Sequence, residues 1–250
     1  MLNEKLHIPL YDLVSENPKL GFVLHTQGIK FYEHASSSVS AISQQFAFNL
    51  EQFKRQSNWQ SQYQLFQDPL LFNKFSAEKV MQYLHFMHRV FVKEKLPYYA
   101  ALIQDIRHAS DDKLISDLKW VFPYFQEDFV HHIFEEEDHF FLYVRNLLKA
   151  IEAQQVSSSL MVEMEFKSIK DYALQHSSED DDMAGIRSLT NQYNPSSKDS
   201  LEIRVLYYEL QEFEKELQFH ARVENEVLFP KAYHLENQVR SILHHLTRCN

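Results

Sequence analysis

The chain has a single cysteine, Cys249, among its 250 residues. One thiol excludes an internal disulfide and a thiolate metal cage, so a metal site in this protein has to use nitrogen and oxygen ligands. Glycine and proline are also scarce, with 3 and 7 residues, and leave long stretches without a helix breaker. Together with abundant Leu, Phe, Gln, Glu and Lys, this composition predicts an all-α protein.

Positive charge is in deficit, because 25 Lys and Arg oppose 35 Asp and Glu for a formal net charge of −10. This balance argues against nucleic acid or an anionic membrane surface as a partner. No apolar run approaches the length of a membrane span, and Met1–Tyr11 carries charges instead of the apolar core of a signal peptide. We therefore expect a soluble, cytoplasmic protein with no nucleic-acid or membrane partner.

Hydrophobic periodicity divides the chain into three parts. Residues 1–60 are predicted to form a small helical N-terminal domain, and residues 61–75 a linker within a Gln-rich, aperiodic stretch. The helices of the N-terminal domain are expected over Leu10–Leu24, with a break at Ser15–Pro18, and over Val39–Gln56, with a turn at Gly28 between them. Residues 76–250 are predicted to form the main domain.

The main domain contains four long segments with a helical period, separated by short polar breaks. Such an arrangement predicts an up-down-up-down four-helix bundle. Pro97 lies inside the first segment and should bend it or reset its hydrogen bonding locally. The segments are Ala77–His108, Lys113–Ala153, Leu160–Asn191 and a fourth that follows Ser200 and reaches His234, with a further short helix expected after Asn237.

A histidine and a glutamate four residues apart occur in two of these segments, as His220 with Glu224 and, 88 residues earlier, as His132 with Glu136. Residues four apart lie on the same face of an α-helix. Both pairs continue the apolar stripes of their helices, whereas the neighbouring pair His131 and Glu135 falls off the stripe and should be solvated. The two pairs on the stripes are therefore predicted to face the core.

The other two segments each contribute one histidine on an apolar stripe. His88 lies 44 residues before His132, and His176 lies 44 residues before His220, so one pattern occurs twice in the chain. A repeated two-helix hairpin is expected to share one central site. The stripe that includes His176 comprises Val162, Phe166, Ile169, Ala173 and Met183.

Four imidazoles and two carboxylates without thiolates suit iron, manganese or zinc. Two carboxylates on opposing helices can each bridge two metals, which leaves open coordination positions for a small diatomic ligand or an oxo bridge and favours a reactive di-iron site. Asp180 is either a further ligand or part of a solvated acidic run. His108 is excluded, because it lies about 30 Å from His88 along a continuous helix. The predicted metal ligands are His88, His132, Glu136, His176, His220 and Glu224.

These residues and their neighbours resemble the hemerythrin-like di-iron proteins, specifically the repair-of-iron-centres family, which restores iron–sulfur clusters after nitrosative or oxidative stress. The resemblance implies two non-haem irons, oxo- and carboxylate-bridged, on those six ligands, with Glu136 and Glu224 as the bridges. The matching stretches are His88…Leu96-Pro97, His132-x-x-x-Glu136-Glu137, Ile186-Arg187-Ser188-Leu189-Thr190-Asn191 and His220-x-x-x-Glu224-Asn225…Leu228-Phe229-Pro230.

The resemblance extends to the N-terminal part, where Ser15–Leu20 and Gly28–Phe31 look like the small helical domain of full-length family members. That domain normally carries adjacent cysteines at the positions that Tyr32 and Glu33 occupy here. Thiol chemistry is therefore absent from this part of the chain. The departure predicts a docking or dimerisation role for the N-terminal domain.

Three functions are compatible with this sequence. The first is a di-iron stress protein that acts on iron–sulfur proteins in cluster repair or handles iron. The second is a hemerythrin-like module that binds or senses oxygen or nitric oxide without turnover. The third is a structural helical bundle whose polar layer fixes the register of its helices, and a homodimer is compatible with each of them.

Overall fold

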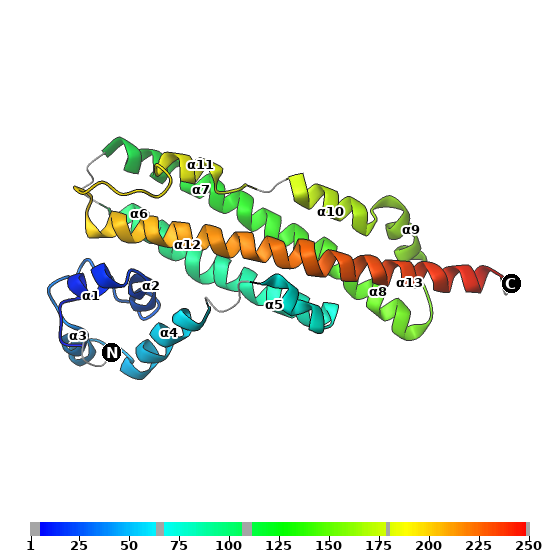
Figure 1. Ribbon diagram of the computed structural model, residues 1–250, viewed down its shortest axis with the longest axis horizontal. Helices are drawn as coiled ribbons and strands as arrows, with labels where there is room; N and C mark the ends of the chain where they lie inside the picture. Colours follow the sequence, from blue (N-terminus) through cyan, green and yellow to red (C-terminus); the bar gives the residue numbers. More distant parts are fainter. Residues whose placement is uncertain (1–5, 64–67, 107–111, 179–180, 249–250) are drawn as a thin grey trace. The chain divides into compact units, whose positions relative to one another are not determined.

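The computed structural model describes residues 6–63, 68–106, 112–178 and 181–248, without the side chains of residues 58–63, 112, 175–178 and 246–248. Throughout these residues the regular elements are helices, and no strand occurs among them (Figure 1). The predicted all-α helical bundle is confirmed. No helix in the described part of the chain is both long enough and apolar enough to cross a membrane.

Contacts divide the chain into two compact units. Unit 1 comprises Met1–Gln67, Phe91–Tyr124 and Met183–Glu216, and unit 2 comprises Asp68–Val90, Phe125–Asp182 and Leu217–Asn250. Each unit collects three separate segments, so neither corresponds to one continuous stretch of sequence. The domain boundaries predicted at residues 60 and 75 remain a prediction.

Over residues 6–63, the N-terminal segment of unit 1 contains the α-helices α1 (Leu10–Glu16), α2 (Lys19–His25), α3 (Val39–Gln45) and α4 (Leu50–Tyr63). The expected break between α1 and α2 is confirmed, and Gly28 makes the expected turn with a φ of 76°. The single helix predicted over Val39–Gln56 is wrong. The backbone is extended at Phe46, and the Asn49 side chain accepts a hydrogen bond from the Gln52 amide at 2.9 Å, which caps a new helix.

Helix α2 packs closely against other parts of unit 1 at Gly21. A Cβ atom at Gly21 would lie 2.8 Å from the Tyr98 hydroxyl, 3.2 Å from Val205 and 3.3 Å from Phe31. Tyr98 is itself fully buried and contacts the Phe22 ring, so its hydroxyl has little room to retreat. Glycine is therefore required at position 21 by close packing.

We expect the substitution Gly21→Ala to lower the free energy of unfolding by about 1–3 kcal/mol, the usual cost of overpacking a filled core. Gly185 provides the control, because a Cβ atom there would meet nothing within 4 Å and the residue lies within a helix, α11 (Ala184–Leu189). Gly185→Ala should leave stability unchanged or raise it by up to about 1 kcal/mol. Urea unfolding followed by circular dichroism measures both variants, and equal stabilities would contradict the packing argument.

The segment predicted as a linker contains regular structure. Helix α4 extends to Tyr63, and a 3₁₀ helix, η2, covers Pro69–Lys74. The Asp68 side chain caps η2 by accepting a hydrogen bond from the Leu70 amide at 2.9 Å, and Phe72 is buried in the core of unit 2. Aspartate before proline is a helix-start signal, so the prediction of a connection without an element is wrong for these residues.

The first, second and fourth predicted helices of the bundle are present, and each is interrupted by a π-helical turn. The first consists of α5 (Ala77–Val90), the π-turn η3 (Phe91–Lys95) and α6 (Leu96–Asp105). The π-turn ends two residues before Pro97, which confirms the predicted local change in hydrogen bonding. The second consists of α7 (Asp112–Glu135), η4 (Glu136–Phe141) and α8 (Leu142–Ala153). The fourth consists of α12 (Leu201–Val223), η5 (Glu224–Leu228) and α13 (Phe229–Arg248). Because α13 continues to Arg248, the predicted end of the fourth helix at His234 is wrong.

The third predicted helix is wrong as a continuous element, because it consists of α9 (Ser158–Phe166), α10 (Ile169–Ser178) and α11. The Asp171 carboxylate accepts hydrogen bonds from the Ser168 amide and hydroxyl, both at 2.7 Å, and fixes a new helix start. Since the break resets the helical phase, Val162 and Phe166 are 51% and 85% exposed instead of buried. Ile169 and Met183 are buried as predicted.

Helices α5, α8, α9, α10 and α13 and the π-turns η4 and η5 contribute to the apolar core of unit 2, in which α8 and α13 lie side by side (Figure 1). The buried carboxylate of Glu236 on α13 joins three of them. It accepts hydrogen bonds from the Tyr143 hydroxyl at 3.2 Å, the Ile169 amide at 2.8 Å and the Arg240 guanidinium at 2.6 and 3.0 Å. These bonds compensate the burial of the charge and hold the start of α10 against α13.

Candidate metal centre

Each of the two His-x-x-x-Glu pairs lies at a junction between an α-helix and a π-helical turn. His132 lies in the last turn of α7, and Glu136 is the first residue of η4. His220 lies in the last turn of α12, and Glu224 is the first residue of η5. π-Turns inside α-helices occur frequently at functional sites, and here the sequence repeat is reproduced as a structural repeat.

The apolar stripe of α7 predicts which histidine and glutamate of α7 and η4 are turned away from solvent. Glu136 is buried, and His132 is partly buried, whereas His131 and Glu135 are exposed. His220 and Glu224 are buried on the other helix, and His88 is buried on α5. The predicted inward orientation is therefore confirmed for these five residues.

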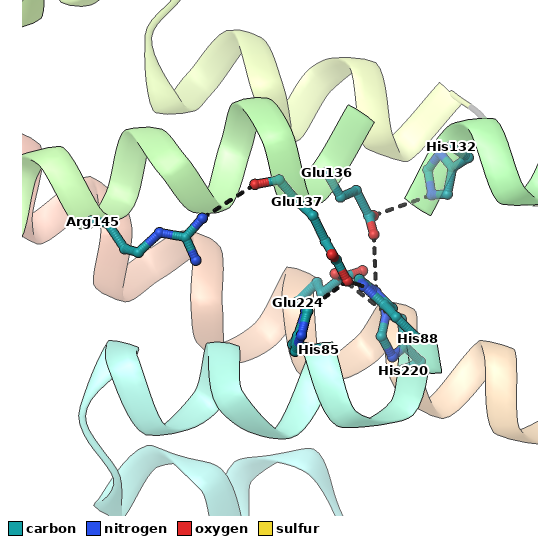
Figure 2. Close-up of polar contacts among 8 residues, drawn as sticks. All are labelled: His85, His88, His132, Glu136, Glu137, Arg145, His220 and Glu224. Atoms are coloured by element: carbon teal, nitrogen blue, oxygen red, sulfur yellow. Dashed lines mark hydrogen bonds and ion pairs between the residues drawn. The ribbon is translucent and has the colours of Figure 1, made fainter. Parts of the chain in front are cut away.

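Four of the predicted ligands converge within unit 2, where His88, Glu136, His220 and Glu224 point toward one another from three helices (Figure 2). Nε2 of His88 lies 2.9 Å from Nε2 of His220 and 3.2 Å from Oε2 of Glu136. Oε1 of Glu224 lies 3.4 Å from Nε2 of His220. One ligand atom from each residue lies within 4.8 Å of the other three.

This spacing matches the donor set of a metal ion. Imidazole nitrogen and carboxylate oxygen bind zinc or iron at about 2.1 Å, so two ligands of one ion lie roughly 3 to 4 Å apart. The three distances given above, 2.9, 3.2 and 3.4 Å, are at that scale. Because the residues are 1–8% exposed, a bound cation would be shielded from bulk water and would compensate two buried carboxylates.

The carboxylates already attract positive charge to the site. Burial alone would lower the pKa of His88, but hydrogen bonds to Glu136 and Glu137 and the charges of Glu136 and Glu224 outweigh it and raise that pKa to about 9. In the metal-free protein, a proton on His88 thus provides positive charge beside the carboxylates at the position where a metal ion would provide it. Phe141 stacks on the His88 ring, with centroids 5.7 Å apart and planes inclined by 9°, and limits rotation of the imidazole.

A further carboxylate, Glu137, extends to the His88 ring (Figure 2). Its Oε1 atom accepts hydrogen bonds from Nδ1 of His88 and from Nδ1 of His85, each at 2.8 Å. Burial alone would raise the pKa of Glu137, but the bonds and charges of His88 and His85 outweigh it and lower that pKa. Sequence reasoning gave neither His85 nor Glu137 a role, although His85 and His88 are one helical turn apart.

The other predicted or considered positions lie beside this group or outside the described residues. His132 is adjacent to it, with Nε2 3.1 Å from Oε1 of Glu136 and a side chain that is 26% exposed. His176 belongs to α10, but its side chain lies outside the described part of the chain. Asp180 and His108 also lie outside the described residues.

No protein-family model matches the chain. The chain is similar to the iron-sulfur cluster repair protein ScdA of Staphylococcus haemolyticus, with 23% identity over 157 residues that cover 62% of this chain and 67% of that protein. The similarity supports the resemblance to repair-of-iron-centres proteins.

Proposed function

We propose that this protein is a hemerythrin-like non-haem di-iron protein that serves in iron–sulfur cluster repair, or in iron handling, under nitrosative or oxidative stress. The observation that carries the proposal is the convergence of His88, Glu136, His220 and Glu224 in a buried site without thiolates. The similarity to a protein named for iron–sulfur cluster repair supports the biological role.

In this proposal the irons are held by His88, His132, Glu136, His176, His220 and Glu224, with the two glutamates as bridges. Bound iron would supply one-electron redox chemistry and a store of iron for cluster rebuilding. The chain itself supplies a buried anionic site, in which two carboxylates favour a cation and the surrounding core excludes bulk water. Manganese or zinc would fit the same donor types and is separated from iron by the metal analysis below.

The first test is the metal content and absorption spectrum of protein purified from iron-replete cells without added metal. We expect two irons per chain and an oxo-to-iron charge-transfer band. A folded protein that contains no metal would contradict the proposal and support the structural-bundle function. Manganese or zinc in place of iron would contradict the di-iron assignment.

The second test is repair. An enzyme that depends on a [4Fe–4S] cluster is inactivated with nitric oxide and incubated with the iron-loaded protein, and its activity should return. The matched control is the same protein after chelation of its iron. Reversible oxygen or nitric-oxide binding by the reduced protein, without recovery of the enzyme, would instead support the binding or sensing module.

A further inference from the structure

Glu137 is the most unusual neighbour of the proposed iron site. It follows Glu136 directly in the chain, and both carboxylates contact the same imidazole. Oε2 of Glu136 lies 3.2 Å from Nε2 of His88, and Oε1 of Glu137 lies 2.8 Å from its Nδ1. In an α-helix adjacent side chains point about 100° apart. Here both residues belong to the π-turn η4, which changes the helical phase from Glu136 onward. Both carboxylates can therefore reach His88.

We propose that Glu137 is a positioning residue that fixes the tautomer and orientation of His88 for metal binding. An anionic carboxylate can only accept, so its bond requires that Nδ1 of His88 carries the proton. When a metal binds, it replaces the proton on Nε2, and the Nε2 lone pair then points toward Glu136 and His220, where the metal is proposed to lie. The inference rests on the proposed function and adds to it a residue outside the ligand set.

Two contacts keep Glu137 in place for this role. His85, which is exposed and lies one helical turn before His88, donates from Nδ1 to the same Oε1 atom at 2.8 Å. The Arg145 guanidinium donates to the backbone carbonyl of Glu137 at 3.4 Å and connects η4 to α8 (Figure 2). Oε1 of Glu137 is therefore held between two imidazoles, and its distance to His88 is constrained from both sides.

A carboxylate that accepts a hydrogen bond from Nδ1 of a metal-bound imidazole also changes the properties of the bound metal. It increases the electron donation of the ring and stabilises the more highly charged metal state. Loss of such a partner typically weakens metal binding about 10- to 100-fold. A side chain that only completes the fold would alter stability without altering these properties of the bound metal.

The experiment compares iron affinity, the absorption spectrum and the midpoint potential of the iron-loaded wild type with those of Glu137→Ala and Glu137→Gln. Glu137→Ala should bind iron about 10- to 100-fold more weakly. Glu137→Gln keeps an acceptor oxygen but lacks the charge, so it should bind more tightly than Glu137→Ala and raise the midpoint potential above that of the wild type. Asp138→Asn, which removes an exposed carboxylate from the same π-turn, is the matched control and should behave as the wild type.

Wild-type affinity, spectrum and potential in both Glu137 variants would overturn the inference while leaving the proposed function intact. If the wild type and Asp138→Asn bind no iron, the proposed function fails first. Circular dichroism of the metal-free proteins detects a variant that does not fold. If Glu137→Ala does not fold, the midpoint potential of Glu137→Gln, which preserves the shape of the side chain, tests the positioning role of Glu137.

Discussion

With iron loaded into the proposed site, replacing Glu224 by alanine is expected to remove that iron almost completely. Glu224 is 1% exposed, opens the π-turn η5 and places Oε1 3.4 Å from Nε2 of His220. Loss of a group that hydrogen-bonds to a metal ligand typically costs 10- to 100-fold in metal affinity, and loss of a ligand that is proposed to bridge two metals removes a bond to each of them. We therefore expect Glu224→Ala to bind iron more than about 100-fold more weakly. Metal analysis and the charge-transfer band measure the loss.

The chain offers a close control for this substitution. Glu135 forms an i, i+4 pair with His131 that has the same spacing as the two proposed ligand pairs, but both residues are exposed. Glu135→Ala should keep the iron content of the wild type. Iron retained by Glu224→Ala at the wild-type level would show that Glu224 is not a ligand, and equal losses in both variants would point to a general effect of charge.

The neighbouring residues Glu135 and Glu136 show how far the sequence predicts the candidate site. The positions of Leu118, Phe122 and Phe129 on α7 define the buried stripe, and that stripe selects Glu136 over Glu135 without a structure. The 44-residue spacing adds His88, which the structure places against His220. Periodicity succeeds because the burial of apolar side chains fixes the rotation of each of these helices.

Periodicity fails where local capping restarts the helix. The Ser168–Asp171 cap separates α9 from α10, and a stripe extended across it assigns Phe166 to the core although the side chain is 85% exposed. The break depends on two side chains, Ser168 and Asp171, and not on the spacing of the apolar residues, so the hydrophobic period alone does not predict it.

The contact of Glu137 with His88, on which its proposed role rests, could not have been predicted from the helical period. A stripe of period 3.6 places only one of two adjacent residues toward a given neighbour. The π-turn η4 changes the helical phase at Glu136, and both glutamates then contact His88. No simple residue pattern signals a π-turn, so this part of the site required the structure.

The second large effect concerns unit 1, where Glu209→Gln is expected to make the protein more stable at neutral and alkaline pH. Glu209 is 4% exposed, and neither its Oε1 nor the hydroxyls of Tyr98 and Tyr99 have a hydrogen-bond partner among the described residues. Burial raises the pKa of Glu209 to about 8, against the lowering effect of Lys95 and Lys19.

The two lysines do not neutralise Glu209, because each is paired with another carboxylate of α12. Lys95 lies 2.5 Å from Glu216, and Lys19 lies 3.2 Å from Glu212. Those two carboxylates raise the pKa of Glu209 further. Glu209 therefore remains a buried acid whose ionisation in the folded protein is unfavourable.

The direction of the pH dependence follows from the raised pKa. The ordinary pKa of glutamate is 4.5, which we take for the unfolded chain. Below pH 4.5 Glu209 is largely neutral in both the folded and the unfolded state, so its ionisation does not change the free energy of unfolding. As the pH rises toward 8, only the unfolded state releases the proton, so the wild type loses stability progressively, by about 3 kcal/mol near pH 7. Glutamine cannot ionise and avoids this loss.

Urea unfolding of the metal-free proteins between pH 4.5 and pH 8 measures the difference. Glu209→Gln and the wild type should have similar stabilities near pH 4.5, and the advantage of the variant should grow to a few kcal/mol by pH 8. Glu94→Gln, which changes an exposed carboxylate next to Lys95, should show no such trend. A constant difference across this range, or a less stable Glu209→Gln at pH 8, would mean that Glu209 is ionised in the folded protein. Its charge would then have to be stabilised within unit 1, and Lys95 and Lys19 are the cations already facing it.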